Sequence, residues 1–181
     1  MSRTGNAGSA ARRWTGCGSR GRCGDKGTRG LRDTGTRGQG DKGLTVQYET
    51  FEHEADIGIR GFGNTPEEAF SNAAAALYSV MVDITRVEQK EFRGVNVTAD
   101  DQEQLLVEWL NSLLAVSDIE RMVFSKFEVR MEGNRLAGTA WGEHLDQGKH
   151  HAHVEVKGAT YHMLSVRQEN GRYVAQCVVD V

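Results

Sequence analysis

Hydrophobic residues recur at two different periods along residues 44–181, and each period predicts a different kind of element. Two stretches repeat apolar residues every three or four positions, which is typical of a helix with one buried face. One stretch follows Thr65 and reaches Met81, and the other follows Asp101. The predicted buried faces consist of Ala69, Phe70, Ala73, Ala74, Leu77, Tyr78 and Met81 in the first helix, and of Leu105, Leu106, Trp109, Leu110, Leu113 and Leu114 in the second.

The start of each predicted helix carries a signal of its own. Thr65 supplies an N-cap oxygen, Pro66 fits the first helical turn, and Glu68 is the acidic partner of a capping box. Asp100 and Asp101 place negative charge where the second helix begins, which is favourable against the helix dipole. Both helices are therefore predicted from their ends as well as from their periodicity.

Elsewhere apolar and polar residues alternate, which predicts β-strands. The dipeptides Gly-Asn at 133–134 and Asn-Gly at 170–171 predict tight turns between consecutive strands. The predicted strands are 46–51, 56–62, 92–97, 123–131, 135–143, 153–156, 160–167 and 172–179. Because helices and strands do not alternate strictly, the sequence predicts an α+β fold with two helices packed on a mixed, largely antiparallel β-sheet.

Residues 1–43 differ in composition from the predicted domain at 44–181. They contain 12 of the 22 glycines, and their 10 Lys and Arg against 3 Asp give a net charge of +7. Without an apolar period such a segment buries too little surface to offset its chain entropy, so we predict a disordered Gly/Arg-rich tail. An organelle transit peptide and a loose RNA-binding segment are the alternatives, although so many glycines resist the helix that transit peptides form.

The composition excludes several classes of protein. No apolar run approaches the roughly 18 residues of a membrane-spanning helix, and no secretory signal core is visible. Three cysteines, two of them in the tail, make a poor disulfide framework, so we expect a reducing, cytoplasmic location. Residues 44–181 hold 12 Lys and Arg against 22 Asp and Glu, a net charge of −10, which argues against direct phosphate contacts with RNA or DNA.

Two aspartates at strand ends are the first candidates for chemistry. Asp56 begins a predicted strand beside Gly58, and Asp180 follows the apolar end of the last strand. Asp180 also lies one residue from the terminal carboxylate of Val181, so oxygen ligands suited to Mg²⁺ or Ca²⁺ gather there. The sequence alone does not show that the two aspartates meet, and two solvated strand ends are the alternative interpretation.

The remaining candidates are less specific. Five histidines between His144 and His162 invite a zinc interpretation, but without a nearby cysteine a polar loop is favoured. Cys177 is interpreted as a core thiol. Lys157 lies two residues after Glu155 and next to Gly158, where it would contact a carboxylate or a phosphate, or form a surface ion pair. No phosphate-binding loop, nucleophile elbow or zinc-protease helix is present.

Several sequence blocks together resemble the archease family. They are residues 53–59 (HEADIGI), 63–70 (GNTPEEAF), 155–162 (EVKGATYH) and 178–181 (VVDV), with 109–111 (WLN) and 124–129 (FSKFEV) between them. The resemblance covers residues 46–181. It departs from the family pattern at Glu54, where Thr is usual, and at Gly158, where Ala is usual.

The resemblance implies a role and a site. Archease is the accessory protein of a GTP-dependent RNA ligase that joins 2′,3′-cyclic-phosphate or 3′-phosphate ends to 5′-hydroxyl ends in tRNA splicing and RNA repair. By resemblance the metal ligands would be Asp56, Asp180 and Val181, holding Ca²⁺ or Mg²⁺/Mn²⁺, and Lys157 would serve ligase activation. The chain would promote guanylylation and multiple turnover without catalysing a reaction, and would meet RNA only through the ligase.

Two other functions stay open. The chain would be an enzyme if Asp56 and Asp180 hold a metal for hydrolysis or nucleotidyl transfer, although it lacks a loop that cradles phosphates. It would be a general chaperone-like module if its acidic surface supported unrelated proteins. Nucleotide turnover by the chain alone would indicate the enzyme, and effects on unrelated ligases would indicate the chaperone.

Overall fold

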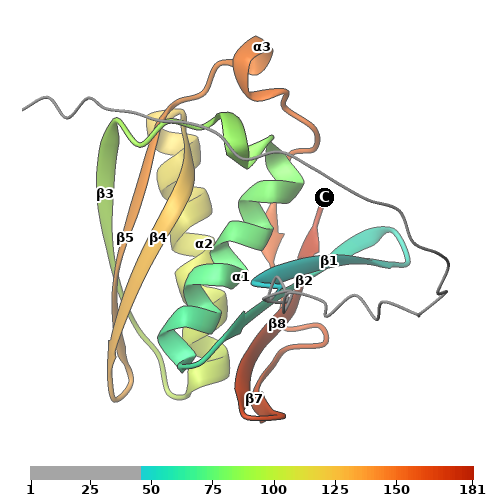
Figure 1. Cartoon of the computed structure of the whole chain (residues 1–181), viewed down its shortest axis with the longest axis vertical. Coiled ribbons are helices and arrows are strands. Elements are labelled where there is room, and N and C mark those ends of the chain that lie inside the picture. The colour runs from blue at the N-terminus through green and yellow to red at the C-terminus, as the bar shows by residue number, and fades with distance from the viewer. Residues whose placement is uncertain (1–45) are drawn as a thin grey trace, which may run out of the picture. The chain divides into compact units, whose positions relative to one another are not determined.

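The structure is a computed structural model that describes residues 46–181 (Figure 1). The predicted tail at 1–43 lies outside the described residues. The elements are β1 (Tyr48–His53), β2 (Asp56–Gly63), α1 (Pro66–Met81), the 3₁₀ turn η1 (Ile84–Arg86), β3 (Glu91–Thr98), α2 (Gln102–Glu120), β4 (Met122–Glu132), β5 (Arg135–His144), α3 (Gln147–His150), β6 (Gly158–Ala159), β7 (Ser165–Glu169) and β8 (Arg172–Asp180).

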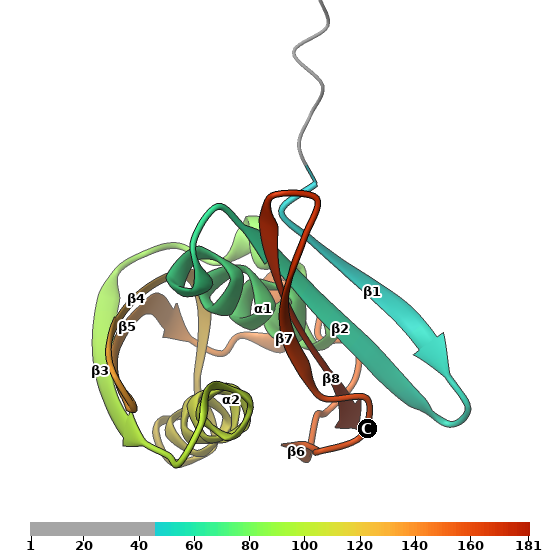
Figure 2. The ribbon, with the colours of Figure 1, turned by 90° about the horizontal axis from the view of Figure 1, so that it is seen from below.

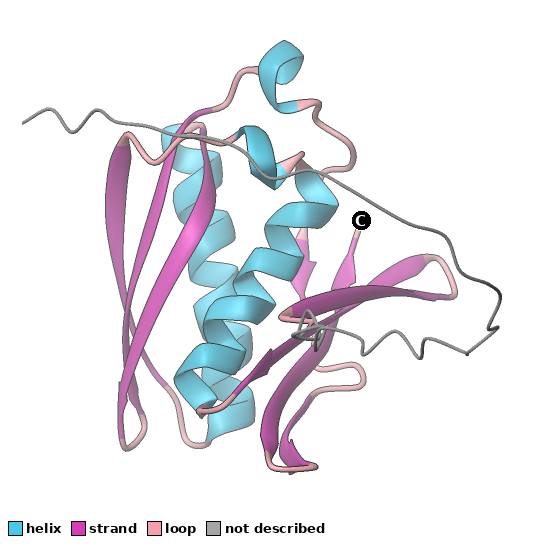
Figure 3. Ribbon diagram, in the orientation of Figure 1, coloured by secondary structure: helices cyan, strands magenta, loops and turns pink. Residues whose placement is uncertain are grey.

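The α+β class is confirmed, and the strands divide into two antiparallel sheets. One sheet has the order β1-β2-β8-β6 with β7 also paired to β8, and the other has the order β3-β5-β4. The two long helices lie between these sheets (Figures 1 and 3). Helix α1 contacts β2 and β4, and α2 contacts β3 and β6, so each helix packs against both sheets.

The buried residues of α1 explain why the fold has a second sheet. This helix buries Ala69, Phe70, Ala73, Ala74, Ala76, Leu77, Tyr78 and Val80, which are spread over more than one face. A helix that is apolar on two sides needs a cover on each side. The sheet formed by β3, β4 and β5 curves around the helices and supplies the second cover (Figure 2).

Both helix starts are confirmed at the level of hydrogen bonds. The amide of Glu68 donates to Thr65 Oγ1 at 3.2 Å, and the amide of Gln104 donates to Asp101 Oδ1 at 2.8 Å. The Glu68 carboxylate accepts from the amide of Asn64 at 2.7 Å, one residue before the cap. The chain therefore enters α1 with a fixed direction directly after β2.

The strands predicted after β5 are partly wrong. Residues 153–156 are irregular, and the predicted strand 160–167 forms a strand only from residue 165, where β7 begins, whereas the short β6 lies just before the predicted range. The amide of His153 donates to the carbonyl of Met81 at 2.8 Å, so this segment crosses the end of α1 instead of joining a sheet. The short helix α3, capped by Asp146, was not predicted.

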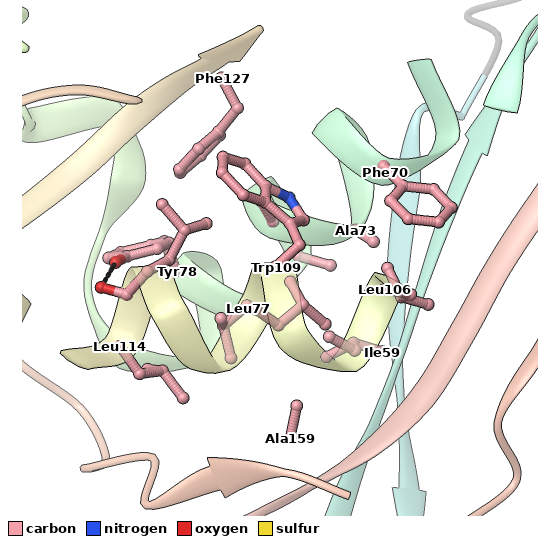
Figure 4. Packing of buried hydrophobic residues seen from close by; sticks show 14 of the residues in the cluster. Ile59, Phe70, Ala73, Leu77, Tyr78, Leu106, Trp109, Leu114, Phe127 and Ala159 are labelled. Atoms are coloured by element: carbon pink, nitrogen blue, oxygen red, sulfur yellow. Dashed lines mark hydrogen bonds between the residues drawn. The ribbon is translucent and has the colours of Figure 1, made fainter. Parts of the chain in front are cut away.

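Large side chains of both helices meet in one core. Trp109 is fully buried between the helices and the three-stranded sheet, close to Phe127 (Figure 4). A Cβ atom at Gly138 would lie 2.2 Å from the Trp109 ring, so only glycine leaves room for it. Cys177 is the predicted core thiol, because it is fully buried and burial raises its pKa to about 12. No helix among residues 46–181 is long and apolar enough to cross a membrane.

Candidate functional site

The register of β2 and β8 brings the two candidate aspartates to one edge of the five-stranded sheet. Ile57 pairs with Val179 in the antiparallel ladder, so the next residue on each strand, Asp56 and Asp180, lies beside the other. Ile59 and Cys177 point into the core. Successive side chains of a strand point to opposite faces, so Asp56 and Asp180, each three residues from one of these core residues, both lie on the other face of the sheet. Asp180 is exposed and Asp56 is half-buried. The structure thus answers the question that the sequence left open.

Lys157 and Val181 complete the same edge. The amide of Lys157 donates to the carbonyl of Asp180 at 2.9 Å, and β6 then pairs Gly158 with Asp180. The Lys157 Nζ donates to the main-chain oxygen of Val181 at 3.0 Å and lies 4.0 Å from Asp180 Oδ1. Asp56, Lys157, Asp180 and Val181 therefore lie together. They belong to the edge at which β8 ends beside β6 (Figure 2).

Asn111 of α2 holds this edge in place, and the sequence analysis missed it. Its side-chain amide donates to the carbonyl of Ala159 at 3.1 Å, and its Oδ1 accepts from the amide of Ala159 at 2.8 Å. The side chain therefore acts like a neighbouring strand for the two-residue β6. A polar residue directly after the apolar pair Trp109 and Leu110 was the available signal.

The donor set fits a hard divalent cation in its chemistry. Two carboxylates and the main-chain oxygen of Val181 are the oxygen ligands that Ca²⁺ and Mg²⁺ select. Within residues 46–181, no group of three or more His, Cys, Asp or Glu side chains is arranged to hold an ion. An ion at Asp56 and Asp180 would therefore need the main-chain oxygen and water as further ligands, and their role as metal ligands stays a prediction.

The histidines do not form the zinc cluster considered for residues 144–162. His150 is fully buried and contacts Glu143, whereas His144, His151, His153 and His162 are exposed. His162 instead meets His53 at the end of β1, with 3.2 Å between their Nε2 atoms. His53 is paired with Asp56 across the β1–β2 turn, so the two rings lie on the face that carries the aspartates. Nothing in the spacing of the sequence indicated this contact.

A second carboxylate cluster surrounds Glu143 of β5. Its carboxylate accepts hydrogen bonds from the side chains of Lys90, Lys149 and His150 and from the amide of Glu88. Burial alone would raise the Glu143 pKa, but the lysine hydrogen bonds outweigh it and hold the pKa far below its usual range. The amide of Asp146 donates to His150 Nδ1 at 3.0 Å, which leaves the ring proton on Nε2, facing Glu143.

A groove of about 790 Å³ lies next to Lys157. It runs between the C-terminal half of α2 and residues 152–157. Leu114, Met122 and Val156 contribute apolar side chains, while Asp118 and Glu155 contribute acidic ones. Since Lys157 also contacts Val181, the groove and the aspartate edge form one continuous surface.

The sequence pattern of the Archease protein family matches residues 48–181, from β1 to the last residue. The chain belongs to the archease family. Protein archease of Sulfurisphaera tokodaii is 44% identical over 137 residues, and Protein archease of Pyrococcus abyssi is 46% identical over 140 residues. Each match covers 75% of this chain and 99% of the relative.

Solved structures show the same archease-family fold. The solution structure of Methanobacterium thermoautotrophicum protein 1598 is 39% identical, with a TM-score of 0.67 over 75% of this chain and 99% of that one. A crystal structure from Thermotoga maritima, described as an archease and possible chaperone, has a TM-score of 0.51 at 19% identity and supports the fold alone. It covers 74% of this chain and 96% of its own.

Proposed function

We propose that this chain is a non-catalytic, metal-binding activator of a GTP-dependent RNA ligase that acts in tRNA splicing or RNA repair. Membership of the archease family supports this role. The observation that carries it is the meeting of Asp56, Asp180, Val181 and Lys157 at one edge of the sheet, although they come from distant parts of the sequence.

The residues of this edge have separable tasks in the proposal. Asp56 and Asp180 hold a divalent cation, Ca²⁺ or Mg²⁺/Mn²⁺, together with the main-chain oxygen of Val181. Lys157 binds that same main-chain oxygen and fixes the end of the chain. When bound, the cation supplies positive charge for phosphate oxygens of the nucleotide or RNA end that the ligase handles.

The partner is a protein with a basic surface. Residues 44–181 carry a net charge of −10, which suits docking to an RNA-binding ligase and disfavours direct contact with RNA phosphates. The groove beside Lys157 extends the contact surface away from the aspartate edge. RNA is therefore reached only through the ligase.

Ligation assays with the ligase limiting test the proposal. Adding the full chain should raise both guanylylation of the ligase and the number of ligation cycles, and Asp180→Ala should abolish this stimulation. Glu132→Ala is the matched control, because Glu132 is an exposed carboxylate at the end of β4, in the three-stranded sheet that does not contain the aspartate edge. GTP turnover by the chain without ligase would contradict the proposal and support the enzyme alternative. Equal stimulation of unrelated ligases would support the chaperone alternative.

A further inference from the structure

We propose that His53 and His162 form a binding site for a divalent transition-metal ion with the ligand preference of Zn²⁺, separate from the oxygen ligands of Asp56 and Asp180. His53 ends β1, and His162 lies in the loop between β6 and β7. Their Nε2 atoms are 3.2 Å apart, their ring centroids are 4.6 Å apart, and the ring planes are inclined at 65°.

The separation of the nitrogens fits one shared ion. Zinc lies about 2.0–2.1 Å from a histidine nitrogen, and a tetrahedral angle between two such bonds places the nitrogens about 3.3 Å apart. The observed Nε2 atoms have nearly that separation. In the structure the same two nitrogens form a hydrogen bond with each other, and a bound ion would replace it.

The main chain fixes both histidines before any ion binds. His53 is paired with Asp56 across the tight β1–β2 turn. The carbonyl of His162 accepts from the amide of Val178 in β8 at 3.1 Å, and the amide of His162 donates to Thr160 Oγ1 at 3.2 Å. Because β2 and β8 are paired, both histidines are anchored to the same sheet.

The ligand atoms determine the class of ion. Imidazole nitrogen suits Zn²⁺, Cu²⁺ and Ni²⁺, whereas Ca²⁺ and Mg²⁺ select oxygen. No third His, Cys, Asp or Glu side chain of the described part of the chain is placed to join the pair. The site therefore takes two protein ligands and water, and exposed His162 leaves it open to solvent. The nearby charge of Asp56 favours any cation bound there.

Calorimetric titration of the full chain with Zn²⁺, and separately with Ca²⁺, tests the site. The protein is produced without a polyhistidine tag. All forms carry Cys17→Ser and Cys23→Ser, because free thiolates also bind zinc. His53→Ala and His162→Ala are compared with His153→Ala, the replacement of an exposed histidine outside the pair. Far-UV circular dichroism confirms that each variant is folded.

Replacing either histidine of the pair should weaken the binding of Zn²⁺ and leave the binding of Ca²⁺ unchanged. Loss of a residue that merely supports a metal ligand already weakens binding about tenfold, so loss of either ligand should weaken Zn²⁺ binding by more than this. His153→Ala should keep the parental Zn²⁺ affinity, and none of the three should change Ca²⁺ binding. Unchanged Zn²⁺ affinity in either pair variant, or an equal loss in the control, overturns the proposal. The assay needs no ligase, so its outcome is independent of ligase activation.

Discussion

Glu143 of β5 and Asp180 of β8 are both carboxylates at the end of a strand, and their surroundings are opposite. Glu143 is buried and accepts hydrogen bonds from two lysines, a histidine and a main-chain amide. Asp180 is exposed, and within residues 46–181 its side chain forms one ion pair, with Lys157 at 4.0 Å, while Asp56 lies beside it on the neighbouring strand. A carboxylate whose partners are all supplied by the chain stabilises the fold, whereas one with open lone pairs is available to a ligand.

The Glu143 cluster joins three segments of the chain through side chains. It links β5 to Lys149 and His150 of α3, and to Glu88 and Lys90 before β3. The aspartate edge joins segments as well, but through main-chain pairing of β2, β6 and β8. Side chains can therefore be removed from the edge without undoing its backbone, whereas removing the Glu143 side chain takes away the hydrogen bonds that it makes to α3 and to residues 88–90.

The largest expected effect is the loss of ligase stimulation in Asp180→Ala and Asp56→Asn. The first removes a charged oxygen ligand, and the second keeps the size of the side chain while removing its charge. Neither empties the core, so the free energy of unfolding should stay within about 0.5 kcal/mol of wild type. Ligation turnover at limiting metal and chemical denaturation measure the two quantities. Wild-type turnover with Asp180→Ala would show that the site is assigned wrongly.

Glu143→Ala should show the reverse pattern. It removes the acceptor of two lysine ammonium groups and of the Glu88 amide, and it leaves the Nε2 of buried His150 without its hydrogen-bond acceptor. We expect a loss of about 2 kcal/mol in the free energy of unfolding, with stimulation per folded molecule unchanged. Glu128→Ala, which breaks the exposed ion pair with Lys126, should cost under about 0.5 kcal/mol.

The sequence predicted local structure well because local signals determine it. The caps at Thr65 and Asp101 and the Gly-Asn dipeptide at 133–134 act within a few residues, and α1, α2 and the β4–β5 hairpin were predicted correctly. The division into two sheets depends on which strands pair across the chain, and periodicity does not encode that. Residues 153–156 show the same limit, because their alternation suggested a strand although they pair with no strand of residues 46–181.

The sequence revealed only part of the candidate site, because some of its contacts depend on which distant segments pack together. Asp56 and Asp180 stood out as charges at the ends of apolar runs, a signal that the sequence contains. The contact of His53 with His162 and the double hydrogen bond of Asn111 to Ala159 depend on register and on helix placement. Such contacts join residues that are distant in the chain and have no spacing to reveal them.

Lys157→Ala should have a smaller effect than loss of an aspartate. It removes the bond to the Val181 oxygen, so stimulation should fall but persist. Metal affinity should not weaken, because Lys157 is itself a cation 4.0 Å from Asp180 and competes with an ion for the same oxygens. Titration with Ca²⁺ and ligation turnover check the two expectations, with Lys126→Ala as an exposed control. Parallel loss of metal binding and stimulation would contradict the separate role of Lys157.

The pH dependence of stability should separate the two carboxylate regions further. The folded-state pKa of Glu143 lies below the unfolded value of about 4.3, so its stabilising contribution is present above that pH and is lost as the pH falls through the folded-state pKa. The stability difference between wild type and Glu143→Gln should therefore shrink between about pH 5 and about pH 3. Denaturation at several pH values measures this difference. A difference that is constant with pH would contradict the role of the Glu143 charge.

The smallest expected effect is that of deleting residues 1–43. The Glu143 cluster and the aspartate edge both lie within residues 46–181, and the family pattern begins at residue 48. The deleted segment holds 12 glycines and no apolar period, so it has little surface to bury against either sheet. Thermal denaturation should give the same midpoint for the shortened and the full chain. A fall of more than about 3 °C, which corresponds to roughly 1 kcal/mol in a domain of this size, would show that the segment packs on the fold.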